Sequence, residues 1–415
     1  MFKKLLGIFV AGIYLSIGCA NADVVKAPSA YLKWLDNLKD EMQERGISKA
    51  TIDEAFAKNY YHPRHKVIKK DRHQTEFVLT TSQYLHRVIA PLRVSQGRKK
   101  YQQLKRKYPA QVNKVPLPYL ISFWGIETNF GTNKGGFSAI EALTLLSYDK
   151  RRSEFFKEEL YNALKIIDEG HISVAKMESS WAGALGHFQF MPSTLRKYGI
   201  DADNDGKINV WNDFNDALYS AANYLSEIGW NPDEPWGKAV SLKWNFDYSL
   251  TGRHHTKTVS AWKKAGVEVS GINDEWKGSV IVPEGHRGQA YLIFDNFKII
   301  MHWNKSENYA LAVGLLADKI QNKKLSQNLG ITYGYKLTKQ DVKKIQSFIN
   351  RQKIAEVDID GVLGGKTRQA IQKTQKLFKM QADGYPDYRL LENIDNYSRY
   401  GYYPPVPIKK LHRGK

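Results

Sequence analysis

Along most of the chain the hydrophobic positions recur every three or four residues, a spacing that predicts amphipathic helices. Within 29–107, Gly46 followed by the run Ser48–Thr51 predicts the end of one helix and the start of the next. A strongly apolar helix is predicted over Tyr119–Thr128, directly after a proline-rich break. Further helices are predicted over three ranges, which are 155–167, 217–228 and 309–321.

The stretch from about 238 to 303 departs from the helical pattern. It is rich in Val, Thr, Ser, Trp and Gly, and its residues alternate between apolar and polar in runs such as 278–282 and 291–294. We therefore expect a small β-rich insertion in an otherwise helical domain over 23–325. The following segment is polar and Lys-rich, and we interpret 326–336 as a linker.

Two further helical stripes, over 342–349 and 367–378, follow the linker and predict a compact second domain over 337–396. The remaining residues, 397–415, form a basic tail. The fold class expected from the whole pattern is mainly α (α+β).

The N-terminus has the features of a secretory signal peptide over 1–22. Two lysines precede an apolar stretch over 5–17, and Ala20–Ala22 fits the small-residue cleavage pattern. The sole cysteine, Cys19, has two interpretations. We favour its removal with the signal peptide. The alternative is a degenerate lipoprotein box, with Ser16 at its usual aliphatic position, that would anchor the chain to the outer membrane through Cys19. We expect an exported, periplasmic monomer.

Charge narrows the class of partner. The chain holds 62 Lys and Arg residues against 42 Asp and Glu residues, for a formal net charge of +20. Such a balance suits nucleic acid, anionic lipid or an acidic polymer. Nucleic acid fits an exported protein poorly, and no zinc, helix-turn-helix or RNP-type signature is present.

Glu127 is an acid on a helix face that is otherwise apolar. Leu120, Phe123 and Trp124 lie seven, four and three residues before it and share that face. Desolvation there would raise the pKa of the carboxyl and keep it protonated near neutral pH, as a general acid requires. A buried acid paired with an arginine is the structural alternative.

The segment around Glu127, 125–131, resembles the catalytic-glutamate segment of the lytic murein transglycosylase B family. Further segments resemble that family in the same order, over 151–156, 180–186, 189–193, 303–304 and 309–310. The resemblance spans about 38–316, and it implies a lysozyme-like catalytic core with a helical N-terminal part.

By this resemblance Glu127 is the catalytic acid and base. The resemblance also implies positions that line or approach the substrate, which are Ser180, Gln189, Tyr224, Asn304, Tyr309, Arg151 and Arg152. For each of these residues a purely structural role is the alternative, most of all for Tyr224, which sits in an ordinary amphipathic helix pattern.

The chemistry that the resemblance implies needs one carboxylate and no cofactor. We find no second acid in a comparable motif, since nothing singles out Asp149. The family cleaves peptidoglycan between N-acetylmuramic acid and N-acetylglucosamine and leaves 1,6-anhydro ends. Two alternatives remain, a hydrolase acting on the same bond and a wall-binding protein without turnover.

A separate acidic run has the spacing of a calcium loop. Asp201, Asp203 and Asp205 alternate, Gly206 follows, and Lys207 would contribute its backbone carbonyl. The alternative is an acidic turn on the surface.

The twelfth position of this loop is Asn212 where a strict EF-hand has Glu. The family resemblance implies a longer loop, whose last carboxylate would come from Asp216. We expect a structural Ca²⁺.

The second domain resembles a peptidoglycan-binding module of the three-helix type. The features that match are the helices over 342–349 and 367–378 and the turn segments 357–364 and 382–386. The polymer's free carboxylates suit the basic charge of the chain. Tethering would raise the local concentration of substrate around the catalytic domain.

Overall fold

The computed structural model describes residues 27–58, 67, 79–149, 152–322 and 337–401. The predicted signal peptide with Cys19, the residue Arg151, the linker 326–336 and residues 402–415 of the basic tail lie outside the described residues. None of the helices within the described ranges has the length and apolar character needed to span a membrane.

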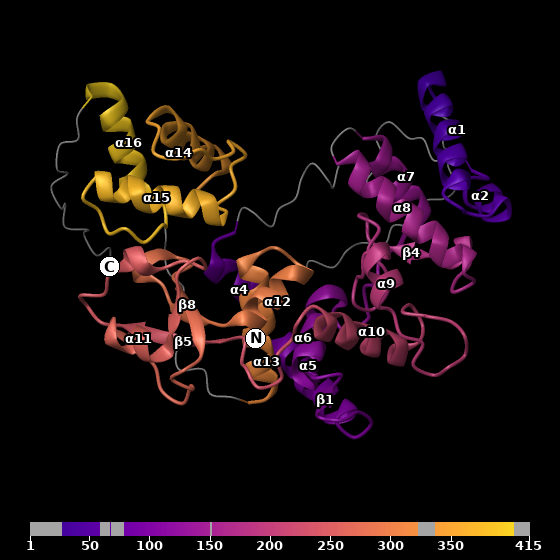
Figure 1. The fold of residues 1–415 in the computed structure, drawn as a ribbon, viewed down its shortest axis with the longest axis horizontal. Helices are drawn as coiled ribbons and strands as arrows, with labels where there is room; N and C mark the ends of the chain where they lie inside the picture. The colour runs from indigo at the N-terminus through magenta and orange to yellow at the C-terminus, as the bar shows by residue number, and fades with distance from the viewer. Residues whose placement is uncertain (1–26, 59–66, 68–78, 150–151, 323–336, 402–415) are drawn as a thin grey trace, which may run out of the picture.

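Helices dominate the first domain (Figure 1), and the fold class is mainly α as predicted. In chain order its α-helices outside the β-rich insertion are α1 (Ser29–Glu44), α2 (Lys49–Ala55), α4 (Thr81–Val88), α5 (Pro91–Leu104), α6 (Leu117–Thr128), α7 (Ala139–Tyr148), α8 (Ser153–Asp168), α9 (Pro192–Tyr198), α10 (Phe214–Glu227), α12 (Asp295–Trp303) and α13 (Glu307–Ile320). Two short antiparallel pairs join β1 (Gln111–Val112) to β2 (Val115–Pro116) and β3 (Phe137–Ser138) to β4 (Glu178–Ser179).

Local capping explains where the predicted break between the first two helices falls. The Ser48 hydroxyl accepts a hydrogen bond from the Thr51 backbone N–H at 3.2 Å, so Ser48 is the N-cap of α2. Gly46 adopts a φ of 85°, which an L side chain rarely tolerates. The boundary predicted from the sequence is therefore confirmed.

Helix α6 lies at the centre of the first domain. It is buried on almost every side and packs against α5, α10 and α13. Pro116 caps its N-terminus, and Asn129, in the left-handed region with a φ of 50°, ends it. The helix that carries Glu127 is thus held by three others.

The β-rich insertion is an antiparallel sheet in the order β6-β8-β9-β5-β7. Its strands are β5 (Gly237–Leu242), β6 (Thr256–Thr258), β7 (Val267–Glu268), β8 (Lys277–Ile281) and β9 (Ala290–Ile293), with α11 (Val259–Lys264) beside them. Val280 lies opposite Leu292 in the register, and both belong to a small core with the buried ring of Trp262.

The predicted end of the insertion was wrong. Residues 295–303 form α12, so the strands end at 293. Phe297 and Ile300 are three residues apart and buried in the main core, a spacing that belongs to a helix packed on that core.

The second domain consists of α14 (Lys339–Arg351), α15 (Gly365–Leu377) and α16 (Tyr388–Tyr400) around its own core. Thr338 and Asp341 form a capping box at the start of α14. In Figure 1 this domain lies next to the β-rich insertion. Direct contacts join the two, including a His286 Nδ1 to Asp383 Oδ2 distance of 2.6 Å.

Candidate active site

Glu127 meets a residue from the far end of the first domain. The Tyr309 hydroxyl, at the start of α13, donates a hydrogen bond to Glu127 Oε1. Tyr309 is 3% exposed, and Glu127 is half-buried at the end of α6. Packing of α13 on α6 therefore positions the carboxyl of Glu127 through a buried phenol.

The loop after α6 is tied to the segment that carries Gln189. The Thr128 hydroxyl donates to the His187 carbonyl at 2.8 Å, and Trp124 Nε1 donates to His187 Nδ1 at 3.1 Å. Burial, and then the nearby Lys134 and Lys100, lower the pKa of His187 to about 4. The imidazole is therefore neutral near pH 7 and able to accept at Nδ1.

Gly131 is required by this same contact. A Cβ at this position would lie 2.6 Å from His187 Cε1 and Nδ1, and the residue has a φ of 82°. The sequence analysis did not single out His187, because its role depends on a partner 63 residues earlier in the chain.

An aromatic cluster adjoins Glu127 and Tyr309. The Trp303 ring centre lies 4.7 Å from that of Phe123, 5.4 Å from Phe190 and 5.2 Å from Tyr224. Phe123 in turn lies 6.2 Å from Tyr309. Flat rings of this kind suit stacking on sugars, and they also pack the core.

Tyr224 belongs to this cluster and is half-buried. Burial raises the pKa of its hydroxyl, and the neighbouring Tyr198 adds to the shift, so the group stays protonated. Tyr198, with its ring centre 4.9 Å from that of Tyr224, was not predicted from the sequence. No local motif marks it.

Ser180, Gln189 and Asn304, three polar residues predicted to contact the substrate, form hydrogen bonds within the protein. Gln189 Nε2 donates to the carbonyls of Lys134 at 3.1 Å and Gly186 at 3.0 Å. Ser180 Oγ accepts from the N–H groups of Ala182 at 3.3 Å and Ala184 at 3.2 Å. Asn304 Oδ1 accepts from the Ser306 N–H at 3.1 Å. These bonds shape loops, and they do not reach Glu127.

Arg152 precedes α8 with a φ of 62°. Its guanidinium carbon lies 4.9 Å from the centre of the Phe156 ring and 5.8 Å from that of Phe155. These contacts place the guanidinium of Arg152 against two aromatic rings of α8.

The acidic run folds into a compact loop. Ligand oxygens of Asp201, Asp203 and Asp205 all lie within 4.8 Å of one another. Asp201 Oδ2 accepts from the Gly206 N–H at 2.8 Å, and Gly206 has a φ of 86°. Three hard oxygen donors at this separation fit a calcium ion.

Asp216 does not join this group. It is 1% exposed, and its two carboxylate oxygens accept from the N–H groups of Ala202 and Asn209, each at 2.8 Å. Burial raises its pKa, although these two bonds oppose the rise. Asp216 therefore holds the two ends of the loop together.

This architecture defines a class of protein. Residues 30–318 match the family described as the transglycosylase SLT domain, and residues 338–394 match the family described as a putative peptidoglycan binding domain. The chain belongs to the SLT transglycosylase family and carries a C-terminal peptidoglycan-binding domain.

Particular relatives are similar over different shares of the chain. SltB3 from Pseudomonas aeruginosa, solved in complex with NAG-anhNAM-pentapeptide, is 35% identical with a TM-score of 0.82, covering 88% of this chain and 99% of that one. Slt35 from Escherichia coli, solved in complex with calcium, is 26% identical with a TM-score of 0.60, covering 69% and 92%.

A curated relative matches over a shorter length. Membrane-bound lytic murein transglycosylase B from Escherichia coli is 31% identical over 215 residues, which span 51% of this chain and 58% of that protein.

Proposed function

We propose that this protein is a lytic transglycosylase that cleaves the bond between N-acetylmuramic acid and N-acetylglucosamine in peptidoglycan, with Glu127 as its catalytic acid and base. The observation that carries the proposal is the buried phenol of Tyr309 bonded to Glu127 on the central helix of an SLT transglycosylase domain. The solved complex of the relative SltB3 with an anhydro-muropeptide supports the same chemistry.

The reaction uses one carboxyl group twice. Glu127 protonates the glycosidic oxygen as the bond to the anomeric carbon breaks. The N-acetyl group of the muramic acid stabilises the developing positive charge from within the substrate. The Glu127 carboxylate then accepts the proton of the sugar's own 6-hydroxyl, whose oxygen bonds to the anomeric carbon and closes the 1,6-anhydro ring. Water is not consumed.

Other residues take supporting parts in this proposal. Tyr309 orients the Glu127 carboxyl, while Tyr224 and Trp303 offer aromatic faces to sugar rings. Ser180, Gln189 and Asn304 shape and line the cleft. Arg151 and Arg152 are proposed near the substrate from the family resemblance alone.

The test is mass spectrometry of the products released from purified sacculi by the mature protein. Products lighter by one water than the reducing-end products of a hydrolase are expected. Glu127→Gln should fold normally and release none, while Glu178→Gln, which changes an exposed acid on β4, should behave as wild type. Turnover retained by Glu127→Gln would refute the assignment, and reducing ends would make the enzyme a hydrolase.

We further propose that Asp201, Asp203 and Asp205, with the Lys207 carbonyl and Asp216, hold a structural Ca²⁺, and that Asp216 also braces the loop. The proximity of the three carboxylates and the calcium complex of the relative Slt35 support this. Chelation should lower the thermal midpoint of the wild type and leave that of Asp203→Asn unchanged. Asp233→Asn, an exposed acid elsewhere, should respond as wild type. Equal midpoints for the wild type with and without chelator, and no bound metal, would contradict the proposal.

We also propose that 1–22, outside the described residues, is a signal peptide and that 326–336 is a linker. The mature chain is then a periplasmic monomer. Lipidation of Cys19 is the alternative to simple cleavage. Intact mass of the mature N-terminus from the native host distinguishes the two.

A further inference from the structure

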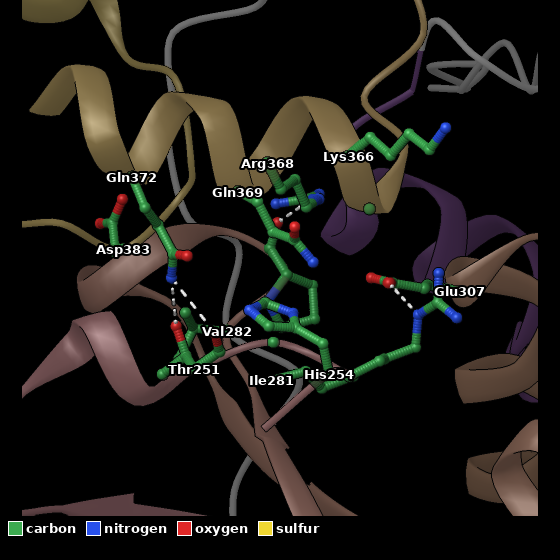
Figure 2. A pocket seen from close by; sticks show the side chains of 14 residues that line it. Thr251, His254, Ile281, Val282, Glu307, Lys366, Arg368, Gln369, Gln372 and Asp383 are labelled. Atoms are coloured by element: carbon green, nitrogen blue, oxygen red, sulfur yellow. Dashed lines mark hydrogen bonds and ion pairs between the residues drawn. The ribbon is translucent and has the colours of Figure 1, made fainter. Parts of the chain in front are cut away.

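A cavity of about 420 Å³ lies between the β-rich insertion and the peptidoglycan-binding domain. We name it the inter-domain crevice, and define it by Thr251–His254 and Ile281–Pro283 on one side and by α15 on the other. Figure 2 shows Arg368 and Gln369 extending from α15 toward His254 of the insertion, with Glu307 at one end of the cavity. Neither Glu127 nor Tyr309 lines this cavity.

Two hydrogen-bonded contacts hold the walls of the crevice together. Arg368 Nη2 donates to the Pro283 carbonyl at 3.1 Å. Gln372 Nε2 donates to the Thr251 carbonyl at 3.2 Å. Both donors belong to α15, so the two domains present a shared and defined surface.

Positive charge converges on this surface. The Arg368 Nε atom is buried and has no hydrogen-bond partner among the described residues. A buried guanidinium N–H without a partner is costly, so a small shift of this side chain toward an acceptor bound in the cavity would be favourable. Arg253 lines the same cavity, and its Nε donates a hydrogen bond to Glu307 Oε1 at 2.6 Å.

The N-terminus of α15 adds to this charge. No side chain caps the helix at Gly364, so the N–H groups of its first turn carry the uncompensated positive end of the helix dipole. Arg253 Nη2 lies 3.4 Å from where a Cβ of Gly365 would stand. A guanidinium thus faces the positive end of a helix, an arrangement that an anion between them stabilises.

The two acids on the cavity wall are already engaged. Glu307 pairs with Arg253. Asp383 accepts from His286 Nδ1 at 2.6 Å and from Gln375 Nε2 at 2.8 Å. Burial lowers the pKa of His254, with His255 and Arg253 adding to the effect, so its imidazole is a neutral hydrogen-bonding group near pH 7.

We propose that the inter-domain crevice binds a carboxylate of a peptidoglycan stem peptide, through Arg368, Arg253 and the N-terminus of α15. This rests on the proposed function, because peptidoglycan supplies the peptide. The volume accommodates a short peptide segment and not a folded partner. Guanidinium groups and helix N–H groups are the donors that carboxylates take in proteins. Substrate recognition then involves both domains together.

The experiment is calorimetric titration of the full chain with a free synthetic stem pentapeptide, which lacks any sugar. Binding is expected, and it should weaken about tenfold or more in Arg368→Gln, since a charge-assisted bond is lost. Lys373→Gln removes the same charge from an exposed position of α15 outside the crevice and should bind as wild type.

Gly364→Asp separates binding from folding. Gly364 has extended backbone angles of −73° and 174°, and a Cβ there meets nothing within 4 Å. Asp is a favoured N-cap, so the thermal midpoint should hold or rise. Its carboxylate occupies the proposed anion position, so pentapeptide binding should be lost.

Two further probes identify the ligand chemistry. A pentapeptide with its carboxylates converted to carboxamides should not bind. Inorganic phosphate that binds where the pentapeptide does not would overturn the proposal, as would pentapeptide binding that Arg368→Gln and Gly364→Asp leave unchanged. Cleavage of glycan strands stripped of peptide tests the proposed function separately, and Gly364→Asp should retain it.

Discussion

Replacing Tyr309 by Phe removes one hydroxyl and leaves the buried ring in place. This hydroxyl donates a hydrogen bond to Glu127 Oε1. A hydrogen bond to a charged group contributes about 1.5–3 kcal/mol. At about 1.4 kcal/mol per factor of ten in rate, kcat should fall about 10- to 150-fold. The thermal midpoint should change little, because the ring stays packed near Phe123.

The assay is steady-state cleavage of a soluble glycan oligomer, with kcat and KM determined separately. Loss of a group that orients the Glu127 carboxyl lowers kcat and leaves KM unchanged, whereas loss of a group that contacts sugar in the ground state raises KM. Tyr161→Phe is the matched control. Tyr161 lies on α8, and its hydroxyl donates to the backbone carbonyl of Arg45 at 3.3 Å, so this variant also removes a hydrogen-bonded hydroxyl but not the one bonded to Glu127. A rise in KM with kcat unchanged would refute the positioning role and return Tyr309 to the substrate contacts predicted from the sequence.

Two further predictions concern stability. A Cβ at Gly314 would lie 2.3 Å from Cδ2 of the buried Trp236, so Gly314→Ala should cost about 1–3 kcal/mol of folding stability and lower the thermal midpoint. Gly136→Ala is the control, because a Cβ there meets nothing within 4 Å, and its midpoint should not fall. Equal midpoints for the two variants would contradict the clash. Burial alone would raise the pKa of Asp383, but hydrogen bonds led by His286 outweigh it and hold the pKa below 3.8. A carboxyl group whose pKa is lower in the folded than in the unfolded protein stabilises the fold at pH values above the unfolded pKa. This stabilisation is lost as the pH falls through the folded pKa. Below about pH 4, the free energy of unfolding should therefore fall more steeply with decreasing pH in the wild type than in Asp383→Asn. Equal slopes of unfolding free energy against pH would contradict this prediction.

Local signals predicted most of the helices correctly. The apolar run over Tyr119–Thr128, the cap at Ser48 and the stripes over 342–349 and 367–378 correspond to α6, α2, α14 and α15. Capping and periodicity act within about four residues, so the sequence displays them directly. The same logic failed at 295–303, where a helix follows the last strand without a side-chain cap to mark its start.

The candidate site was only partly predictable. Glu127 was identified from its place on an apolar helix and from a family resemblance, and that helix is at the centre of the domain. The pairing of Glu127 with Tyr309 joins residues 182 positions apart, and no local pattern encodes which hydroxyl meets which carboxyl. Asp216 was expected among the metal ligands; both its oxygens accept backbone N–H groups, and its place at the metal stays a prediction. The roles of the remaining cleft residues stay predictions.

The sequence by itself determined the helical class, the acidic loop, the glutamate on its apolar helix and the second domain, because each is written in residues close together along the chain. Only the tertiary structure decided that Tyr309 bonds to Glu127, that Trp303 packs against the other rings of the aromatic cluster, and that Arg368 of α15 bonds to Pro283 of the insertion. These contacts depend on the packing of whole helices and sheets. Burial and charge at such contacts are set by every neighbouring element at once, so they emerge only when the chain has folded.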